Sequence, residues 1–285
     1  MMKESLGEYQ ARDGRSLAFR KWAGAGDVLV LVHGIESNSI WFRDFISHLN
    51  RQGFAIYGID RRGSGLNEFG RGDIEDYKTF FNDIEDAIRF IGIQHPRNKI
   101  YLMGICWGGL LAVNYAISSN IKVDGLILLS PALYRKVDFS LFKKAIARIC
   151  LCLKPRMHFT IPIKDGMFTT NAKYLSLIKN DKMRLRTLSA RFFNQIIKME
   201  NEMSPLNHQI EIPVLVLLAG HDDIVDNKKV EQWFGRLISK DKELRIFSDF
   251  HHVMPFEEDS RPLADFISHW AKSREASGEK QYIES

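Results

Sequence analysis

A cysteine inside a glycine-rich turn is the residue of this sequence best placed for covalent chemistry. The apolar stretch ending at Met103 runs into Gly104-Ile105-Cys106-Trp107-Gly108-Gly109, and an apolar helical stretch follows at 110–117. A nucleophile exposed on a sharp strand-to-helix turn requires this order of elements. Glycines two positions before and after it leave room for the strained backbone of such a turn. The pattern predicts Cys106 as a nucleophile for acyl transfer; the alternative is a buried structural cysteine.

A second turn could hold the negative charge that develops on the substrate. The apolar stretch Val28–Val32 leads into His33-Gly34-Ile35-Glu36. Around a nucleophile turn, the oxyanion is held by the backbone N–H after the nucleophile and by one from a loop after an earlier strand. We therefore expect the N–H groups of Ile35 and Trp107 to form an oxyanion hole.

The elements that must position these residues are short apolar stretches alternating with amphipathic ones. Continuous runs of Val, Ile and Leu predict buried parallel strands at 28–32, 54–59, 99–103, 125–129, 213–218 and 243–247. Helical spacing of apolar residues falls between strands, at 41–49 and 80–91. Upstream, 8–11 and 16–22 flank an Arg-Asp-Gly-Arg turn and predict an antiparallel hairpin. The fold class expected is α/β, with a mostly parallel, doubly wound sheet.

The alternation stops between Pro131 and about Glu211, where helical patterns occur without a comparable strand. This indicates an inserted helical cap and four segments: an N-terminal core at 1–130, the cap at 131–211, a C-terminal core at 212–272 and a polar tail at 273–285. In the cap, one helix face is expected to pack against the protein. It carries Phe139, Phe142, Ile146, Ile149 and Leu153.

The composition fits a single globular domain with an insertion. The chain has 285 residues, of which 45% are hydrophobic. Its N-terminus lacks the apolar run of a signal peptide, and no stretch approaches the roughly 18 apolar residues of a membrane span. Three cysteines, an odd number, argue against a disulfide framework. We expect a cytoplasmic protein without a transmembrane segment.

Positive charge is concentrated in the cap. Residues 131–200 hold 15 Lys and Arg against 4 Asp and Glu, although the whole chain has a net charge of only +5. Such asymmetry is typical of attraction to an anionic partner, here an anionic lipid, coenzyme A or an acidic carrier protein. Nucleic acid is not expected, because no helix-turn-helix, zinc or RNA-binding motif accompanies the charge.

Several segments together resemble one enzyme family. HGIESNSIWF at 33–42, GIDRRGSGLN at 58–67 and GICWGG at 104–109 are similar to the monoacylglycerol lipase and lysophospholipase branch of the α/β-hydrolase superfamily. This resemblance implies the α/β-hydrolase fold with a helical cap. It also implies that Asp222, in LLAGHDDIVDN, is the acid and His252, in FSDFHHVMPFEE, is the base. Asp223 and His251 are the neighbouring alternatives.

The departure from that branch is the nucleophile, because serine ordinarily stands where this chain has Cys106. Cysteine at the turn also resembles dienelactone hydrolases and polyhydroxyalkanoate synthases. The expected intermediate is a thioester, which amines and thiols capture more readily than they capture an oxygen ester. The leading expectation is an acyl hydrolase acting on an ester or thioester of a lipophilic acyl group through a Cys-His-Asp triad. An acyltransferase using a coenzyme A or carrier-protein thioester, and a non-catalytic ligand-binding homologue, are the alternatives.

No cofactor or metal is expected. The glycines at 58–65 lack the spacing of a dinucleotide site. Cys150 and Cys152 have only His158 nearby in sequence, which is too few ligands for zinc.

Overall fold

The computed structural model describes residues 4–274 and is built on one eight-stranded sheet. The strands follow the order β1-β2-β4-β3-β5-β6-β9-β10. Their bounds are β1 Glu4–Gln10, β2 Ser16–Trp22, β3 Val28–Val32, β4 Ala55–Ile59, β5 Ile100–Ile105, β6 Gly125–Leu129, β9 Val214–His221 and β10 Lys242–His251. The six strands from β4 to β10 in this spatial order pair in parallel. The β1–β2 and β2–β4 pairs are antiparallel. The predicted mostly parallel sheet with an antiparallel hairpin at one edge is confirmed.

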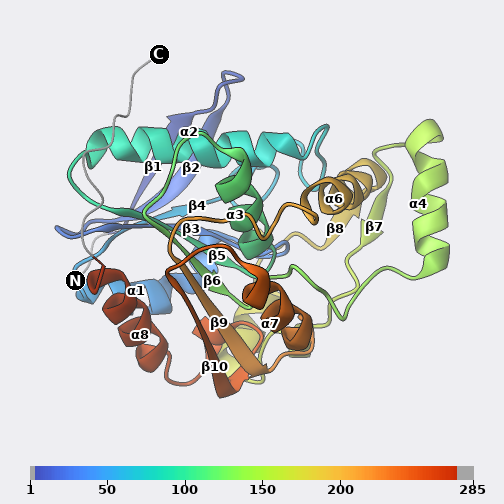
Figure 1. The fold of residues 1–285 in the computed structure, drawn as a ribbon. Coiled ribbons are helices and arrows are strands. Elements are labelled where there is room, and N and C mark those ends of the chain that lie inside the picture. The colour runs from blue at the N-terminus through green and yellow to red at the C-terminus, as the bar shows by residue number, and fades with distance from the viewer. Residues whose placement is uncertain (1–3, 275–285) are drawn as a thin grey trace.

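Helices cover both faces of the sheet. Figure 1 shows α2 (Lys78–Gln94) and α3 (Trp107–Ser118) on one side and α1 (Arg43–Arg51) and α8 (Arg261–Lys272) on the other. Every residue of β3, β4, β5 and β6 is buried, which explains why these strands are continuously apolar. Helix α7 (Asn227–Arg236) begins after Asp226, whose side chain accepts a hydrogen bond from the Lys229 N–H at 3.2 Å.

The segment between β6 and β9 forms a separate layer over the carboxyl edge of the sheet. It contains α4 (Leu141–Leu153), β7 (His158–Thr160), α5 (Ala172–Asn180), β8 (Thr187–Ser189) and α6 (Ala190–Met203). The antiparallel pair β7 and β8 was not foreseen, because three residues are too few to give a strand pattern. Three short 3₁₀ turns complete the structure at Ser39–Phe42, Asp165–Met167 and Met254–Phe256.

Helix α4 differs from the expectation for its apolar face. It lies at the outer edge of the cap, with α6, β7 and β8 between it and the sheet (Figure 1). Phe139, just before the helix, packs on Phe193 of α6, but Phe142, Ile149 and Leu153 are 75%, 63% and 76% exposed. The prediction that these three pack within the protein is wrong, because the face of α4 that meets α6 is the one carrying Ala147 and Cys150.

The C-terminal tail and a possible membrane span were both addressed by the sequence. Most of the polar tail predicted at 273–285 lies outside the described residues. Within residues 4–274, no helix is long and apolar enough to cross a bilayer.

Candidate active site

Cys106 occupies a strained turn between β5 and α3. Its backbone has φ 55° and ψ −119°, in the region that L-residues rarely adopt. A Cβ on Gly104 would lie 2.5 Å from the Gly108 carbonyl oxygen, and one on Gly108 would lie 2.1 Å from that of Val32. Glycine is therefore required at both positions. The thiol is 6% exposed and faces the loop at Gly34, where an added Cβ would lie 3.4 Å from the Cys106 Cβ.

Asp222 follows β9 and is held by the start of the next loop. Its Oδ1 accepts hydrogen bonds from the N–H groups of Ile224 and Val225, both at 2.8 Å. Burial alone would raise the pKa of Asp222, but His252 and these two N–H groups lower it below its ordinary value. The carboxylate is thus held ionised. Asp223 is exposed and outside this arrangement.

His252 follows β10 and is fully buried. Its Nδ1 lies 2.8 Å from Oδ2 and 2.9 Å from Oδ1 of Asp222. Burial lowers the pKa of His252, but Asp222 and Cys106 outweigh this and raise the pKa to about 10. Nε2 is buried and forms no hydrogen bond of good geometry with any residue of 4–274. It is therefore available to the thiol or to a substrate. His251 instead pairs with Glu257 at 3.0 Å.

Arg61 orients the loop after β3. Its Nη2 donates to the carbonyl oxygens of Gly34 at 2.9 Å and Ile35 at 2.8 Å. Because C=O and N–H point in opposite directions across a trans peptide, the Ile35 N–H is directed away from Arg61. Trp107 is the first residue of α3, so its N–H has no carbonyl one turn earlier to bond. Both N–H groups are thus available where the sequence predicts an oxyanion hole.

Arg61 also brings a buried positive charge to the site. Burial lowers the pKa of Arg61 to about 9, against the opposing effects of Asp60 and Cys106. The guanidinium stays protonated at neutral pH and lies 4.8 Å from the Trp107 ring centroid. A cation here favours a negatively charged sulfur. Sequence reasoning missed this role, although the arginine lies in one of the segments that carry the family resemblance.

The cap clamps the same loop through a buried ion pair. Arg184 Nε donates to Oε2 of Glu36 at 2.7 Å, and both side chains are 2% exposed. Burial, partly offset by Arg184, raises the pKa of Glu36 to about 7. Beside this pair, Asp181 accepts hydrogen bonds from Asn38 at 2.8 Å and Trp41 at 2.6 Å. These cap contacts, which fix the position of Ile35, were also missed.

A narrow apolar cavity lies above the thiol, beneath the cap. Its volume is about 50 Å³. Apolar side chains from the core and the cap line it next to Cys106: Ile35, Trp107, Ile161, Leu188, Phe193 and Ile196. Such a lining suits a hydrocarbon chain.

Metal ligands do not gather at this site or elsewhere in the described chain. Among residues 4–274, no three His, Cys, Asp or Glu side chains are placed to hold an ion together. Cys150 contacts Met157, with 3.5 Å between the two sulfurs, and Cys152 is exposed.

Comparison with known proteins supplies the family. A family model described as serine aminopeptidase, S33, matches residues 25–259. The chain belongs to this α/β-hydrolase family. The family description names a serine, whereas this chain carries Cys106 at the turn between β5 and α3.

The chain is similar to curated proteins that are named as a phospholipase and as monoglyceride lipases. It is 24% identical over 239 residues to phospholipase YtpA of Bacillus subtilis, covering 82% of this chain and 90% of that protein. It is 23% identical over 271 residues to the monoglyceride lipase of Homo sapiens, covering 93% and 89%.

Solved structures show the same fold. A soluble variant of the monoglyceride lipase of Saccharomyces cerevisiae, in complex with a substrate analog, superposes with a TM-score of 0.85. The two are 20% identical over 98% of this chain and 97% of the other. The α/β-hydrolase fold expected from the sequence is confirmed.

Proposed function

We propose that this protein hydrolyses a carboxylic ester or thioester of a lipophilic acyl group through a covalent Cys106 acyl-enzyme. The observation that carries the proposal is the placement of a thiol on a strained turn, next to a buried His252–Asp222 pair and under an apolar cavity. The lipase relatives and the S33 family support the ester class of substrate.

In the first half of the reaction, the Cys106 thiolate attacks the acyl carbon. The carbonyl oxygen becomes an oxyanion, which the N–H groups of Ile35 and Trp107 stabilise by hydrogen bonding. His252, protonated at neutral pH with a pKa of about 10, gives its Nε2 proton to the departing alcohol or thiol. The bond from carbon to the leaving group breaks, and a thioester on Cys106 remains.

In the second half, water replaces the leaving group. His252, now neutral, takes a proton from water as the hydroxide oxygen attacks the thioester carbon. Collapse of the second oxyanion releases the carboxylic acid and returns the thiolate. Asp222 holds the imidazole in one tautomer and stabilises its charged form throughout.

Acyl transfer to an acceptor other than water is the second candidate. The apolar surroundings of Cys106 favour it. Cys106 is 6% exposed and lies under mainly apolar side chains, which would disfavour water relative to a bound acceptor at the intermediate. An alcohol, amine or thiol that binds there could capture the thioester instead. A coenzyme A or carrier-protein thioester would then be the acyl donor.

The experiment is a product analysis with defined acyl donors. Wild type, Cys106→Ala and Cys152→Ala are incubated with octanoyl glycerol and octanoyl-coenzyme A, with and without hydroxylamine or added glycerol. We expect octanoic acid from wild type and Cys152→Ala, whose substitution removes an exposed thiol away from the site, and none from Cys106→Ala. Acyl glycerol formed from octanoyl-coenzyme A in place of acid would favour the transferase. Binding of donors without any turnover would leave a non-catalytic ligand-binding protein.

We further propose that the basic cap meets an anionic lipid surface in the cytoplasm. Helix α4 has three basic residues, Lys143, Lys144 and Arg148, and no acidic one. Its exposed apolar residues are Phe142, Ile149 and Leu153. A lipid surface accepts both positive and apolar side chains from the same helix. This favours anionic lipid over coenzyme A or an acidic carrier protein.

A further inference from the structure

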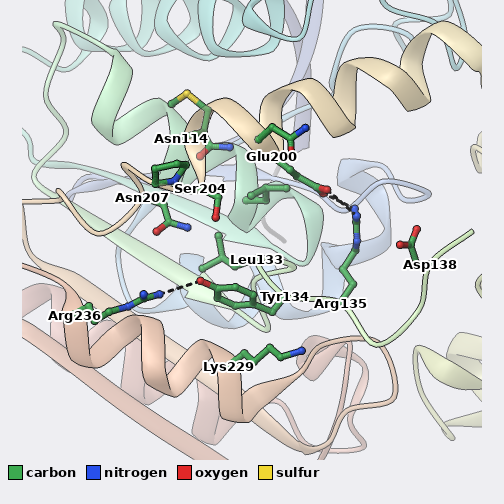
Figure 2. A pocket seen from close by; sticks show the side chains of 14 residues that line it. Asn114, Leu133, Tyr134, Arg135, Asp138, Glu200, Ser204, Asn207, Lys229 and Arg236 are labelled. Atoms are coloured by element: carbon green, nitrogen blue, oxygen red, sulfur yellow. Dashed lines mark hydrogen bonds and ion pairs between the residues drawn. The ribbon is translucent and has the colours of Figure 1, made fainter. Parts of the chain in front are cut away.

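A second, larger cavity adjoins the one above Cys106. Its volume is about 620 Å³, and it lies between α3, the end of α6, α7 and the segment after β6. Arg135 and Asp138 line both cavities. The catalytic cavity is mainly apolar, whereas this neighbour is surrounded by polar and charged side chains (Figure 2).

Two cations from α7 reach this cavity. Arg236 donates from Nη2 to the Tyr134 hydroxyl at 3.2 Å, and no carboxylate within residues 4–274 forms an ion pair with it. Lys229 pairs with Asp226 at the start of its own helix, at 3.2 Å. In Figure 2 the Arg236 and Tyr134 side chains meet on one side of the cavity. The unneutralised charge of Arg236 suits an anion.

A buried donor on α3 faces the same space without a partner. Asn114 lines the cavity and is 1% exposed, and its Nδ2 has no hydrogen-bond partner among the described residues. A buried amide donor without an acceptor is costly in a folded protein, and a ligand oxygen removes this cost. Asn114 therefore points to a ligand that brings an acceptor.

An ion pair stands where the two cavities meet. Arg135 Nη1 lies 2.8 Å from Glu200 Oε1, and Nη2 lies 3.1 Å from Oε2. The two charges neutralise each other, so the positive charge left in the cavity is that of α7. Figure 2 shows this pair on the side opposite Arg236, with Tyr134 between them.

We infer that this second cavity binds the phosphate of a phosphate-bearing leaving group. The inference rests on the proposed function: the acyl chain lies over Cys106, and the leaving group extends past Arg135 toward Arg236 and Asn114. Phosphate oxygens accept hydrogen bonds from both the guanidinium and the amide, as a glycerol hydroxyl group or a choline cation cannot do equally well. A glycerol phosphate headgroup and coenzyme A both supply this chemistry.

The test compares substrates that differ only in the phosphate. Octanoyl glycerol, octanoyl glycerol phosphate and octanoyl-coenzyme A are assayed with wild type, Arg236→Gln, Asn114→Leu and the control Arg97→Gln, which removes an exposed arginine after α2. We expect Arg236→Gln to lower kcat/KM for a phosphate-bearing substrate by about 10- to 100-fold, the effect of one charge-assisted hydrogen bond. Octanoyl glycerol should be unaffected, and Arg97→Gln should behave as wild type. The substrate that shows the loss identifies the source of the phosphate.

Asn114→Leu separates ligand binding from folding. The leucine keeps the volume and removes the unpartnered donor, so the variant should unfold at the same temperature as wild type or higher, while losing kcat/KM on the phosphate substrate. Equal losses on octanoyl glycerol and on the phosphate substrates, or no loss on either, would overturn the inference.

Calorimetric binding of glycerol phosphate tests the same site without turnover. Wild type and Arg97→Gln should bind it, and Arg236→Gln should bind at least about 10-fold more weakly. Phosphate binding that depends on Arg236 in a protein that hydrolyses nothing would overturn the proposed function alone. Hydrolysis of octanoyl glycerol by a protein that does not bind glycerol phosphate, and that shows no Arg236-dependent loss on the phosphate-bearing substrates, would overturn this inference alone.

Discussion

Asp222 and Asp223 are neighbours in sequence with the same side chain in opposite surroundings. Asp222 is buried, accepts hydrogen bonds from two backbone N–H groups and contacts His252, whereas Asp223 is exposed. A similar contrast separates His252 from His251, which pairs with Glu257. These pairs offer matched controls one residue away from the proposed triad.

Asp222→Asn should lower kcat by roughly 10²- to 10⁴-fold with little change in KM. The amide can hold the imidazole in the wrong tautomer and cannot stabilise its positive charge. Steady-state kinetics on octanoyl glycerol measures the effect, and Asp223→Asn should stay within about two-fold of wild type because surface changes are near neutral. A comparable loss in Asp223→Asn would move the acid to that residue.

The pKa of His252 predicts how stability depends on pH. Its value in the folded protein is raised from 6.5 to about 10, so the folded state binds a proton more tightly than the unfolded chain does. The resulting stabilisation is complete below pH 6.5 and is lost as the pH rises from 6.5 to about 10. Urea unfolding over this window should show a steeper loss of stability in wild type than in His252→Gln. Parallel pH profiles for the two proteins would contradict the assignment.

At this scale, local sequence pattern predicts the strained turn that carries Cys106, but it does not predict the residues that surround the proposed nucleophile. Cys106 could be predicted because the glycines that allow its backbone are adjacent in the chain. Asp222 and His252 came from a family resemblance rather than from local pattern. The Arg184–Glu36 pair joins residues 148 positions apart, and only the folded cap brings them together.

Among the elements, the turn between β5 and α3 leaves the least room for an added side chain. The backbone of Val32 approaches Gly108 so closely that any side chain there must displace β3 or α3. Gly108→Ala should destabilise the protein by roughly 2–4 kcal/mol, as overpacking against backbone does. Chemical unfolding measures it against Gly235→Ala in α7, where an added Cβ meets nothing within 4 Å. We expect that control to change stability by less than about 1 kcal/mol; equal stability of the two variants would contradict the strained turn.

Helix α4 is the element predicted to meet lipid. Leu153→Ser should weaken binding to vesicles that contain phosphatidylglycerol by roughly 10-fold, the effect of removing one buried leucine from the lipid interface. Neither protein should bind pure phosphatidylcholine vesicles strongly, because attraction to the basic residues would be missing. Vesicle co-sedimentation measures this, with Leu6→Ser on β1 as control, since Leu6 is 62% exposed. Equal losses in both variants would show that α4 is not the contact.

Element prediction succeeded for the strands of the central sheet. All the predicted strands of the sheet are present, and β2, β3 and β6 have the predicted bounds. β3 and β6 are buried on both faces, whereas the bounds of the partly buried β2 came from the turn before it. The cap was harder to predict. Its strands are three residues long, and the apolar residues of α4 carry helical spacing whether they face the protein or its surroundings.

On the scale of the whole molecule, the cap both covers the site and holds the loop after β3, where the oxyanion hole is proposed. Arg184 and Asp181 of the cap bind Glu36, Asn38 and Trp41 of the core. The narrow cavity of about 50 Å³ above Cys106 lies between the cap and the core, so the cap contributes much of its apolar lining. The domain boundaries at 131 and 211 remain predictions, and the cap elements α4 to α6 all lie between them.

The central claim is a thioester between the acyl group and Cys106, and intact-protein mass spectrometry tests it directly. Wild type, Cys152→Ala and Cys106→Ala are mixed with octanoyl-coenzyme A or p-nitrophenyl octanoate and quenched in acid at short times. The account predicts the added mass of one octanoyl group on wild type and Cys152→Ala, located on the peptide that contains Cys106, and none on Cys106→Ala. An equal adduct on Cys106→Ala, or turnover by wild type with no adduct at any time, would contradict it.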